Sequence, residues 1–397
     1  MSVLSRLSRR SLLKYGSLSG LGAFITACLA QNAPTTSQAP GTGAAATSSG
    51  ASSVAPAANA ITWKIQSGWA GNDIFQTMFL NWKASVEEMS GGRIKIDALP
   101  VNTITNNNGM LDAVHAGTLD GAHEVPAYGP FQKDHAASLI GTGPMMGMSG
   151  QMWLSWYWYG GGQQLYQDLI QKKLKLNVVS FLHMPMQNQP LGWFKDEIKS
   201  PDDFKGMKFR TVGLATGIYQ FMGASVINVA GADVASSLDR GVIDAAEFNN
   251  TTSDTAYGLP DVRKICMTQS YHQPSEILGL DLNKTKFDSM PKDLQAIMKW
   301  SVIAASADGE WIQMAKNSED YAKLVARGIK FIKTPQSVRD SQLQAWDKVI
   351  ADESKDNPEF VAILKSQKAW AERIFPWADA INIPTPDPVS YAARPKV

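Results

Sequence analysis

The sequence predicts an α/β protein of two lobes, followed by a long helical region toward the C-terminus. Short apolar strands alternate with amphipathic helices from Ile61 to Leu282, which favours parallel sheets flanked by helices. The chain beyond Ile61 is long enough for two lobes at the usual size of about 100–200 residues per domain. After Pro291 the pattern is almost wholly helical.

The first 28 residues resemble a twin-arginine export signal that ends in a lipobox. A paired-arginine block, Ser8-Arg9-Arg10-Ser11-Leu12-Leu13-Lys14, precedes an apolar run from Tyr15 to Ala27, and Cys28 follows directly. The run is too short and too rich in Gly and Ser to serve as a permanent membrane helix of about 20 apolar residues. We expect export in the folded state, cleavage before Cys28 and acylation of that cysteine. The alternative is an ordinary secretory signal with a chance arginine pair; either reading places the mature protein in the periplasm.

Residues 29–60 form the next segment, which is mostly Ala, Ser, Thr, Gly and Pro, with no charge from Gln31 to Ala60. Such a composition cannot bury enough apolar surface to offset its ordering entropy, so it predicts a flexible linker. Apart from Cys28 the chain holds one cysteine, Cys266, which excludes an intrachain disulfide in the mature body.

The composition of the whole chain argues against some classes of partner. Hydrophobic residues make up 44% and charged residues 18%, an ordinary globular balance, and the formal net charge is +1. This charge gives no reason to expect nucleic acid or an anionic membrane surface as partner. No stretch after the signal is apolar for long enough to cross a bilayer.

The individual elements follow from local periodicity and turn residues. An amphipathic helix is predicted from Asp73 to Met89, ended by Gly91-Gly92, and a second from Asn108 to Ala116. Strands are predicted at residues 61–65, 93–97, 120–123, 177–181, 191–194, 207–210, 225–228, 245–248 and 277–282. Two long helices, Leu294–Ala326 and Gln336–Phe375, are predicted on either side of a break near residues 328–332.

Catalytic motifs are missing from the sequence. It has no GxSxG elbow, no HExxH and no GxxxxGK[ST] phosphate loop. Gly160-Gly161-Gly162 follows an aromatic run instead of a strand, so it does not predict a nucleotide loop. His183 and His272 are isolated and favour structural roles. The cluster Trp153, Trp156, Tyr157, Trp158 and Tyr159 on one helix favours packing over a stacking platform for a ligand.

Two sequence runs are more informative. In the first, Ser200-Pro201-Asp202-Asp203-Phe204-Lys205-Gly206-Met207-Lys208-Phe209-Arg210, Ser200 is a natural N-cap, and a strand follows that ends in Arg210. The carboxyl ends of strands are where α/β folds bind ligands, and a guanidinium there offers a planar fork for a carboxylate. A surface ion pair is the alternative for Arg210.

The second run, Leu238-Asp239-Arg240-Gly241-Val242-Ile243-Asp244-Ala245-Ala246-Glu247-Phe248, predicts a helix that ends at Gly241 and a strand that delivers Glu247 and Phe248 to its carboxyl end. The run His115-Ala116-Gly117-Thr118-Leu119-Asp120-Gly121-Ala122 has the same outline. These are two helix-Gly-strand units of similar build, one in each predicted lobe.

The two longer runs resemble the two signatures of the DctP family of TRAP-transporter substrate-binding proteins. They stand in family order, and the likeness extends over nearly all of residues 61–375, helical tail included. The nearer likeness is to the TakP-like branch, which binds α-keto acids or lactate. The resemblance implies a periplasmic binding protein-like fold with an interlobe ligand cleft, hinge strands and long C-terminal helices. It implies lobe I at 61–186, lobe II at 187–280, and a return to lobe I with the helical region at 281–397.

The resemblance also implies roles for individual residues. Arg210 would clamp the substrate carboxylate, while Phe248 would line the pocket and lend its carbonyl to a metal ion. Gln189, Glu247 and Glu276 would complete the metal shell, with Gln189 also touching substrate. Gln187 would share a face with Gln189 in an extended segment and remains an alternative.

These oxygen donors suit a hard cation, Na⁺ or Ca²⁺, and do not suit zinc. Phe248 stands where relatives of this branch have Trp, which removes an indole donor and leaves the preference for the ligand's side chain open. Two further residues, Trp69 after the first strand and Tyr128 after the third, are candidates for substrate contact or for packing between lobes.

The sequence thus predicts a periplasmic protein that binds a small monocarboxylate, a 2-oxo acid such as pyruvate or else lactate, and delivers it to the membrane subunits of a TRAP permease without catalysing a reaction. A homodimer through the C-terminal helices is a further expectation from the resemblance. Alternatives are a secreted metal-dependent enzyme that uses Glu247 and Glu276, a binding protein for a dicarboxylate or an aromatic acid, and a binding protein for another permease class or a sensor.

Overall fold

The computed structural model describes residues 60–143 and 145–381. The predicted export signal, the predicted lipidation site Cys28 and the predicted linker up to residue 59 lie outside the described residues. Within the described part, no helix has the length and apolar character needed to cross a membrane.

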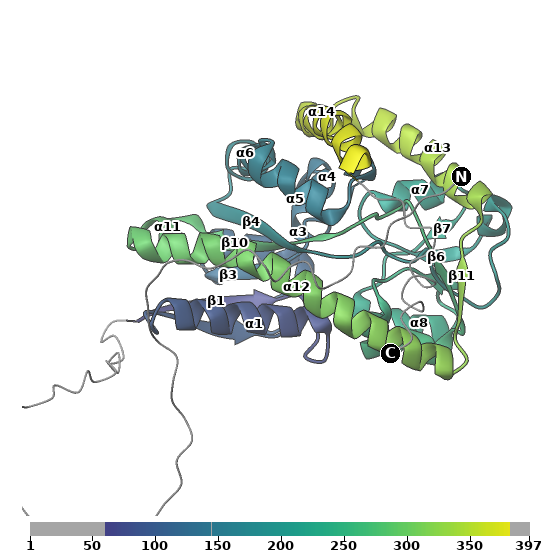
Figure 1. The fold of residues 1–397 in the computed structure, drawn as a ribbon, viewed down its shortest axis with the longest axis horizontal. Helices are drawn as coiled ribbons and strands as arrows, with labels where there is room; N and C mark the ends of the chain where they lie inside the picture. The colour runs from purple at the N-terminus through teal and green to yellow at the C-terminus, as the bar shows by residue number, and fades with distance from the viewer. Residues whose placement is uncertain (1–59, 144, 382–397) are drawn as a thin grey trace, which may run out of the picture. The chain divides into compact units, whose positions relative to one another are not determined.

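Two mixed sheets form the framework (Figure 1). The first sheet has the strand order β2-β1-β3-β10-β4, and the second has the order β11-β9-β5-β8-β6-β7. The strands of the first sheet are β1 (Ile61–Ser67), β2 (Ile94–Leu99), β3 (Gly121–Glu124), β4 (Val178–Pro185) and β10 (Ile277–Asn283). Those of the second are β5 (Gly192–Phe194), β6 (Lys208–Arg210), β7 (Ser225–Val226), β8 (Ala245–Ala246), β9 (Ile265–Thr268) and β11 (Lys330–Lys333).

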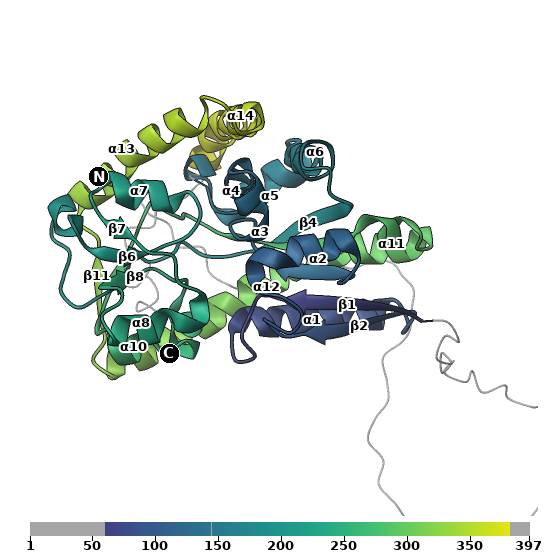
Figure 2. The ribbon, with the colours of Figure 1, turned by 180° about the vertical axis from the view of Figure 1, so that it is seen from behind.

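Helices cover both sheets, and Figure 2 shows α7, α8 and α10 around the strands of the second sheet. The main helices are α1 (Ile74–Met89), α2 (Met110–Ala116), α3 (Gly129–Lys133), α4 (Ala136–Gly141), α5 (Gly150–Tyr159), α6 (Gly162–Asp168), α7 (Ala215–Phe221), α8 (Val234–Asp239), α9 (Thr251–Ala256), α10 (Leu259–Val262), α11 (Lys284–Asp288), α12 (Lys292–Ala326), α13 (Gln336–Glu353) and α14 (Pro358–Ile381). Short helical turns occur at 107–109, 145–147, 169–173, 201–204 and 231–233.

The α/β class and all nine predicted strands are confirmed, but the expected parallel pairing holds for only part of each sheet. β10 runs antiparallel to both β3 and β4, and β5 runs antiparallel to β8 and β9. The reason is that the chain passes between the sheets after β4 and again before β10, so the strands at these crossings enter against the direction of their neighbours. Sequence periodicity reports strand existence but carries no signal for such crossings.

Two smaller differences concern short elements. Strand β9 (Ile265–Thr268) was not predicted from the sequence. The predicted helix 336–375 is interrupted at residues 354–357 and forms α13 and α14. The break near 328–332 contains β11, which pairs with β9 in the second sheet.

The expected lobe limits remain a prediction, but two of them can be compared with the strands that form each sheet. The limit at residue 280 falls inside β10, which belongs wholly to the first sheet. The region 281–397 does not return to lobe I alone, because β11 joins the second sheet and α13 packs on α7. Helix α12 links the sheets, as it contacts α1 and β4 at one part and α9 at another.

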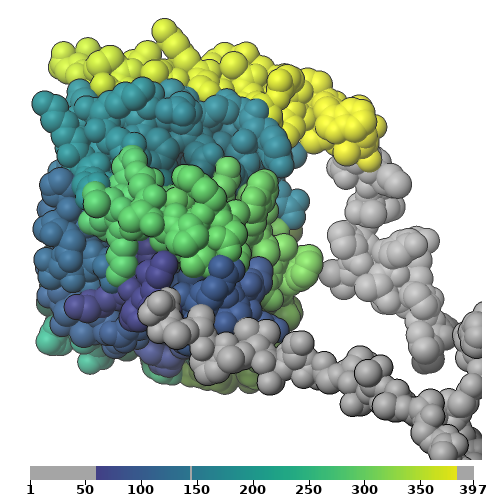
Figure 3. All heavy atoms as spheres, turned by 90° about the vertical axis from the view of Figure 1, so that its left-hand side faces the viewer, coloured from purple at the N-terminus to yellow at the C-terminus, as the bar shows by residue number. Residues whose placement is uncertain are grey.

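Large buried side chains fix this arrangement. Trp63, Phe79 and Trp82 fill a core between the first sheet, α1 and α12, while Trp193 and Leu238 belong to a separate core in the second lobe. Figure 3 shows α12 in green on the surface, between the chain's first elements in blue and α14 in yellow. The aromatic helix α5 packs as predicted, with Trp153, Trp156 and Tyr157 fully buried. Burial of each such side chain stabilises the fold by roughly 1.5–3 kcal/mol.

We predict that Gly192→Ala lowers the free energy of unfolding by at least about 3 kcal/mol, through left-handed strain and overpacking. Gly192 has φ of 145°, and an added Cβ would lie 2.6 Å from the carbonyl oxygen of Ala246. Gly241→Ala is the matched control: φ is 71° there and the added Cβ meets nothing within 4 Å, so only about 1–2 kcal/mol is expected. Urea unfolding measures both, and equal losses would contradict the steric argument.

Candidate functional site

The candidate site is a small cavity of about 20 Å³ where the two sheets meet. Its wall contains all seven residues singled out from the sequence: Trp69, Tyr128, Gln189, Arg210, Glu247, Phe248 and Glu276. Arg210 ends β6, Glu247 and Phe248 follow the neighbouring parallel strand β8, and Glu276 directly precedes β10. Strand pairing therefore brings these side chains to one edge, although their contacts with a ligand or an ion stay predictions.

Gln189 and Glu276 come from the two segments that cross between the sheets. These segments hydrogen-bond to each other through their backbones: the N–H of Met186 donates to the Glu276 carbonyl at 2.7 Å, and the N–H of Gln189 donates to the Gln273 carbonyl at 3.3 Å. The pairing fixes Gln189 on the cavity wall. Gln187, the alternative left open by the sequence, lines a different pocket and donates to the sulfur of Met314.

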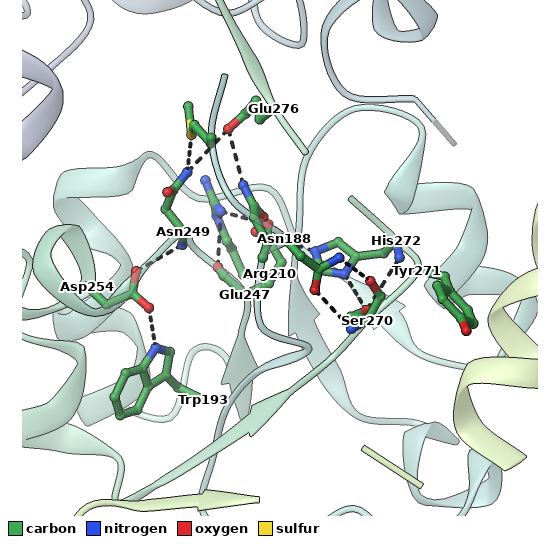
Figure 4. Close-up of polar contacts among 12 residues, drawn as sticks. Asn188, Trp193, Arg210, Glu247, Asn249, Asp254, Ser270, Tyr271, His272 and Glu276 are labelled. Carbon is green, nitrogen blue, oxygen red and sulfur yellow. Dashed lines mark hydrogen bonds and ion pairs between the residues drawn. The ribbon is translucent and has the colours of Figure 1, made fainter. Parts of the chain in front are cut away.

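Arg210 and Glu247 form a buried ion pair, which Figure 4 shows at the centre of the site. The Nη1 group of Arg210 donates to Glu247 Oε1 at 2.9 Å and to the Glu247 carbonyl at 3.2 Å, while Nε donates to the Val229 carbonyl. Both side chains are almost fully buried, at 2% and 1% exposure. The guanidinium also lies 5.4 Å from the ring centroid of Phe248. These contacts hold the guanidinium group of Arg210 in a fixed orientation.

Among the residues that the structure describes, Glu276 has amide partners and no ion-pair partner. The Nε2 group of Gln189 donates to Glu276 Oε2 at 3.2 Å, and Nδ2 of Asn249 donates to the same oxygen at 3.4 Å. Asn249 is held in turn by Asp254, which accepts from its backbone N–H at 2.9 Å and from the indole of Trp193 at 2.7 Å (Figure 4). A line of buried polar groups therefore positions Glu276.

Burial makes ionisation of the two glutamates unfavourable. Desolvation raises the pKa of Glu247 to about 7, although Arg210 opposes this shift. Desolvation, followed by the charge of Glu247, raises the pKa of Glu276 to about 8. A hard cation between the two carboxylates would favour their ionised forms and offset this cost.

The donors present fit such a cation. Glu247 and Glu276 supply carboxylate oxygens, Phe248 has a carbonyl next to Glu247, and Gln189 Oε1 is buried without a hydrogen-bond partner. An amide oxygen of this kind beside two carboxylates is a donor whose chemistry suits Na⁺ or Ca²⁺. Among the described residues no cluster of three or more His, Cys, Asp or Glu side chains could bind a metal, so a shell here depends on amide and carbonyl oxygens.

Trp69 and Tyr128 both lie on the cavity wall, but they differ in the hydrogen-bonding groups that they offer to it. The indole of Trp69 donates to Nδ1 of His123 at 2.8 Å, so this residue offers the cavity its ring face and no free donor. Tyr128 is half-buried beside Arg210, and burial raises the pKa of its hydroxyl, which keeps it a neutral donor. Trp69 therefore presents a ring face to the cavity and Tyr128 a hydroxyl, and contact of either residue with a ligand stays a prediction.

The isolated histidines are buried and neutral. Desolvation lowers the pKa of His272 to about 3 and that of His183 well below its usual value. His272 bonds Ser270 through Nδ1, and its Nε2 lies 4.0 Å from Glu247, too far for a strong contact with a neutral ring. These environments agree with structural roles.

Sequence reasoning did not single out five further wall residues, Asp73, Phe75, Val212, Asn249 and Gln273. Asn249 directly follows the second signature run, so its position in the sequence could have identified it. Asp73 was recognisable only as the cap of α1, a role it fills by accepting from the N–H of Phe75. Gln273 lies in the irregular crossing segment, where no period signals its direction.

Comparison with known proteins adds independent findings. A monocarboxylate 2-oxoacid-binding periplasmic protein of Nostoc is 28% identical over 292 residues, covering 74% of this chain and 79% of the relative. A TRAP periplasmic solute-binding protein of Colwellia psychrerythraea, solved with calcium and pyruvate, is 28% identical with a TM-score of 0.75, covering 81% and 98% of the two chains. One of Pseudoalteromonas atlantica, solved with sodium and pyruvate, is 26% identical with a TM-score of 0.76, covering 85% and 100%.

The sequence profile described as bacterial extracellular solute-binding protein, family 7 (DctP), matches residues 66–356. This span contains both signature runs, both crossing segments and every residue of the cavity wall. The chain belongs to the DctP family of extracytoplasmic solute-binding proteins of TRAP transporters.

Proposed function

We propose that this chain binds a small monocarboxylate 2-oxo acid, such as pyruvate, together with Na⁺ or Ca²⁺ and delivers it to a TRAP permease. The observation that carries the proposal is the buried Arg210 facing two carboxylates and an orphaned amide oxygen in one cavity. The ligands of the Nostoc, Colwellia and Pseudoalteromonas relatives support the same class of ligand and ion.

The charge on the cavity wall favours one carboxylate per ligand. Arg210 is the only cationic side chain among the described residues that line the inner cavity, and the remaining titratable acids there are Asp73, Glu247 and Glu276. A dicarboxylate would leave its second carboxylate without a cation beside buried acidic groups, which is unfavourable. A monocarboxylate places its one charge on the guanidinium fork.

In this proposal Arg210 orients the carboxylate, and Tyr128 donates to an oxygen of the ligand. Gln189, Glu247, Glu276 and the Phe248 carbonyl hold the cation, which supplies positive charge for the 2-oxo oxygen. Phe248 and Phe75 form an apolar wall that excludes water. No side chain is required to move a proton, so the protein contributes affinity and selectivity and performs no catalysis; turnover of the bound acid would favour the enzyme alternative.

The proposal also covers how the protein is anchored and how it meets the permease. The mature protein would be tethered in the periplasm by a lipid on Cys28, and closure of the lobes on the ligand would present a surface to the permease. The tether is tested by mass spectrometry of the native protein, since an unmodified Cys28 or cleavage at another position would contradict it.

A homodimer is proposed through the exposed side of the C-terminal helical region. The exposed apolar residues of α12 recur at the spacing of one helix face: Trp300, Trp311, Met314, Tyr321 and Val325. Such a face is typical of helix packing, and α14 adds exposed Trp377. Light scattering should give a dimer mass that Trp311→Glu converts to monomer; a monomer mass for the unaltered protein would contradict the proposal.

We predict that Arg210→Met abolishes pyruvate binding, because the cavity loses its only guanidinium. Arg210→Lys should weaken binding by about 10–100-fold, since a point charge replaces the bidentate fork. Arg240→Met is the matched control, because Arg240 belongs to the second signature run but is exposed and does not line the cavity. Isothermal titration with calcium present measures all three, and unchanged affinity in Arg210→Met would remove Arg210 from the site.

We also predict that the melting temperature of the cation-free protein falls as pH rises. Between the usual glutamate pKa of 4.5 and the values of about 7 and about 8 for Glu247 and Glu276, the folded protein binds more protons than the unfolded chain. Stability is therefore complete below this window and is lost as pH rises through it. A bound cation keeps both groups ionised and removes the loss.

Calorimetry in sodium-free buffer tests this, with chelator or with Ca²⁺ at about pH 6 and about pH 9. The increase in melting temperature on adding Ca²⁺ should be larger at the higher pH, and Glu276→Gln should reduce it. An equal increase at both pH values, unchanged in Glu276→Gln, would rule out a cation on these carboxylates.

A further inference from the structure

The inner cavity continues past Arg210 into a larger cleft of about 280 Å³ that is open to solvent. The two spaces share the residues Trp69, Tyr128, Arg210, Val212 and Phe248. A carboxylate on Arg210 would therefore have the cation-binding groups on one side and this cleft on the other. This volume is close to the lower end of the range of about 300–1,000 Å³ for small-molecule pockets, so the cleft has room for a ligand larger than pyruvate.

Asparagines dominate the polar part of the cleft wall. The loop between β2 and α2 contributes Asn102, Asn106, Asn107 and Asn108, and the segment after β7 contributes Asn228 from the other lobe. Asparagines in loops often serve the backbone, and two of these do: Asn106 accepts from the N–H of Gly109, and Asn107 donates to the Gly68 carbonyl. The Oδ1 atom of Asn107 remains buried without a partner.

The other three asparagine side chains are exposed to the cleft. Asn102, Asn108 and Asn228 make no side-chain hydrogen bond to any other residue that the structure describes. Each amide offers two donors and one acceptor, which matches hydroxyl groups because they both donate and accept. The two lobes thus present free amides to the same space.

Charge and shape narrow the chemistry further. Apart from Arg210, no charged side chain is found among the described residues of the cleft wall, so a second ionic group on the ligand has no counterpart. Small residues, Ala70, Ala230 and Gly231, leave room between the lobes. Gly231 is required for this, since an added Cβ would lie 2.9 Å from the ring of Phe248. The rings of Trp69, Phe248 and Tyr257 offer apolar faces for carbon–hydrogen groups.

From these observations we propose that the protein accepts 2-oxo acids whose carbon chain extends beyond C3 and carries hydroxyl groups. This inference rests on the proposed function, because Arg210 and the cation hold the head of the ligand in both. The tail lies in the cleft, with its hydroxyls bound by Asn102, Asn107 and Asn108 from one lobe and Asn228 from the other. Tail binding from both lobes stabilises the closed form.

A matched pair of acids tests the proposal by isothermal titration with Ca²⁺ present. The probes are 4,5,6-trihydroxy-2-oxohexanoate and 2-oxohexanoate, which share one carbon chain and differ in hydroxyls, with pyruvate as the head-group reference. The unaltered protein should bind the hydroxylated acid at least about tenfold more tightly than 2-oxohexanoate, as expected for two or more net hydrogen bonds.

Variants assign the effect to the cleft. Asn108→Ala and Asn228→Ala, one in each lobe, should each weaken binding of the hydroxylated acid by about 2–10-fold and leave pyruvate affinity unchanged. Asn81→Ala, at an exposed position of α1 outside the cleft, is the control and should change neither. Melting temperatures of the variants verify that each one folds.

The outcomes separate the inference from the function on which it rests. Pyruvate binding with no preference for the hydroxylated acid, or with cleft variants that behave like Asn81→Ala, would overturn the inference alone. Failure of every 2-oxo acid, pyruvate included, would overturn the proposed function and the inference with it.

Discussion

The buried ion pair between Arg210 and Glu247 is the interaction on which the site depends. It joins the ends of the adjacent strands β6 and β8, and it keeps a guanidinium inside a cavity where an unpaired charge would be prohibitive. In the proposed function, a carboxylate ligand competes with Glu247 for this guanidinium, and a cation on Glu247 relieves that competition. The proposal therefore predicts selectivity for an anionic ligand together with a cation.

Buried polar groups also position Glu276, the second carboxylate of the site. The line of groups from Trp193 through Asp254 to Asn249 fixes Glu276, which has no ion-pair partner among the described residues, and burial raises the pKa of Asp254 to about 7 as well. In the described part of the chain, several acids are buried and Arg210 is the one buried arginine. This excess of acid over base suits a site that completes its charge balance with an ion from solution.

Much of this could be predicted from the sequence, because the informative residues stand in regular elements. Arg210 and Glu247 follow strands whose ends are visible in the apolar pattern, and the family signatures identify both. The antiparallel entry of β5 and β10, the break between α13 and α14, and wall residues such as Gln273 were not predictable. They depend on long-range crossings and irregular loops, where local periodicity carries no information. Alternation alone could not separate Gln189 from Gln187, because both would lie on one face of an extended segment. In the structure, the backbone pairing of the crossing segments separates their positions.

The most direct test of the account is the coupling between the two ligands, measured by titrating pyruvate with Ca²⁺ present and with chelator in sodium-free buffer, and by titrating Ca²⁺ with and without pyruvate. Since binding free energies are linked, each ligand must strengthen the other by the same factor, and the exchange at Arg210 and Glu247 predicts a factor well above 1. Equal pyruvate affinity with Ca²⁺ and with chelator would contradict the account, because the carboxylate would then reach Arg210 without a cation on Glu247.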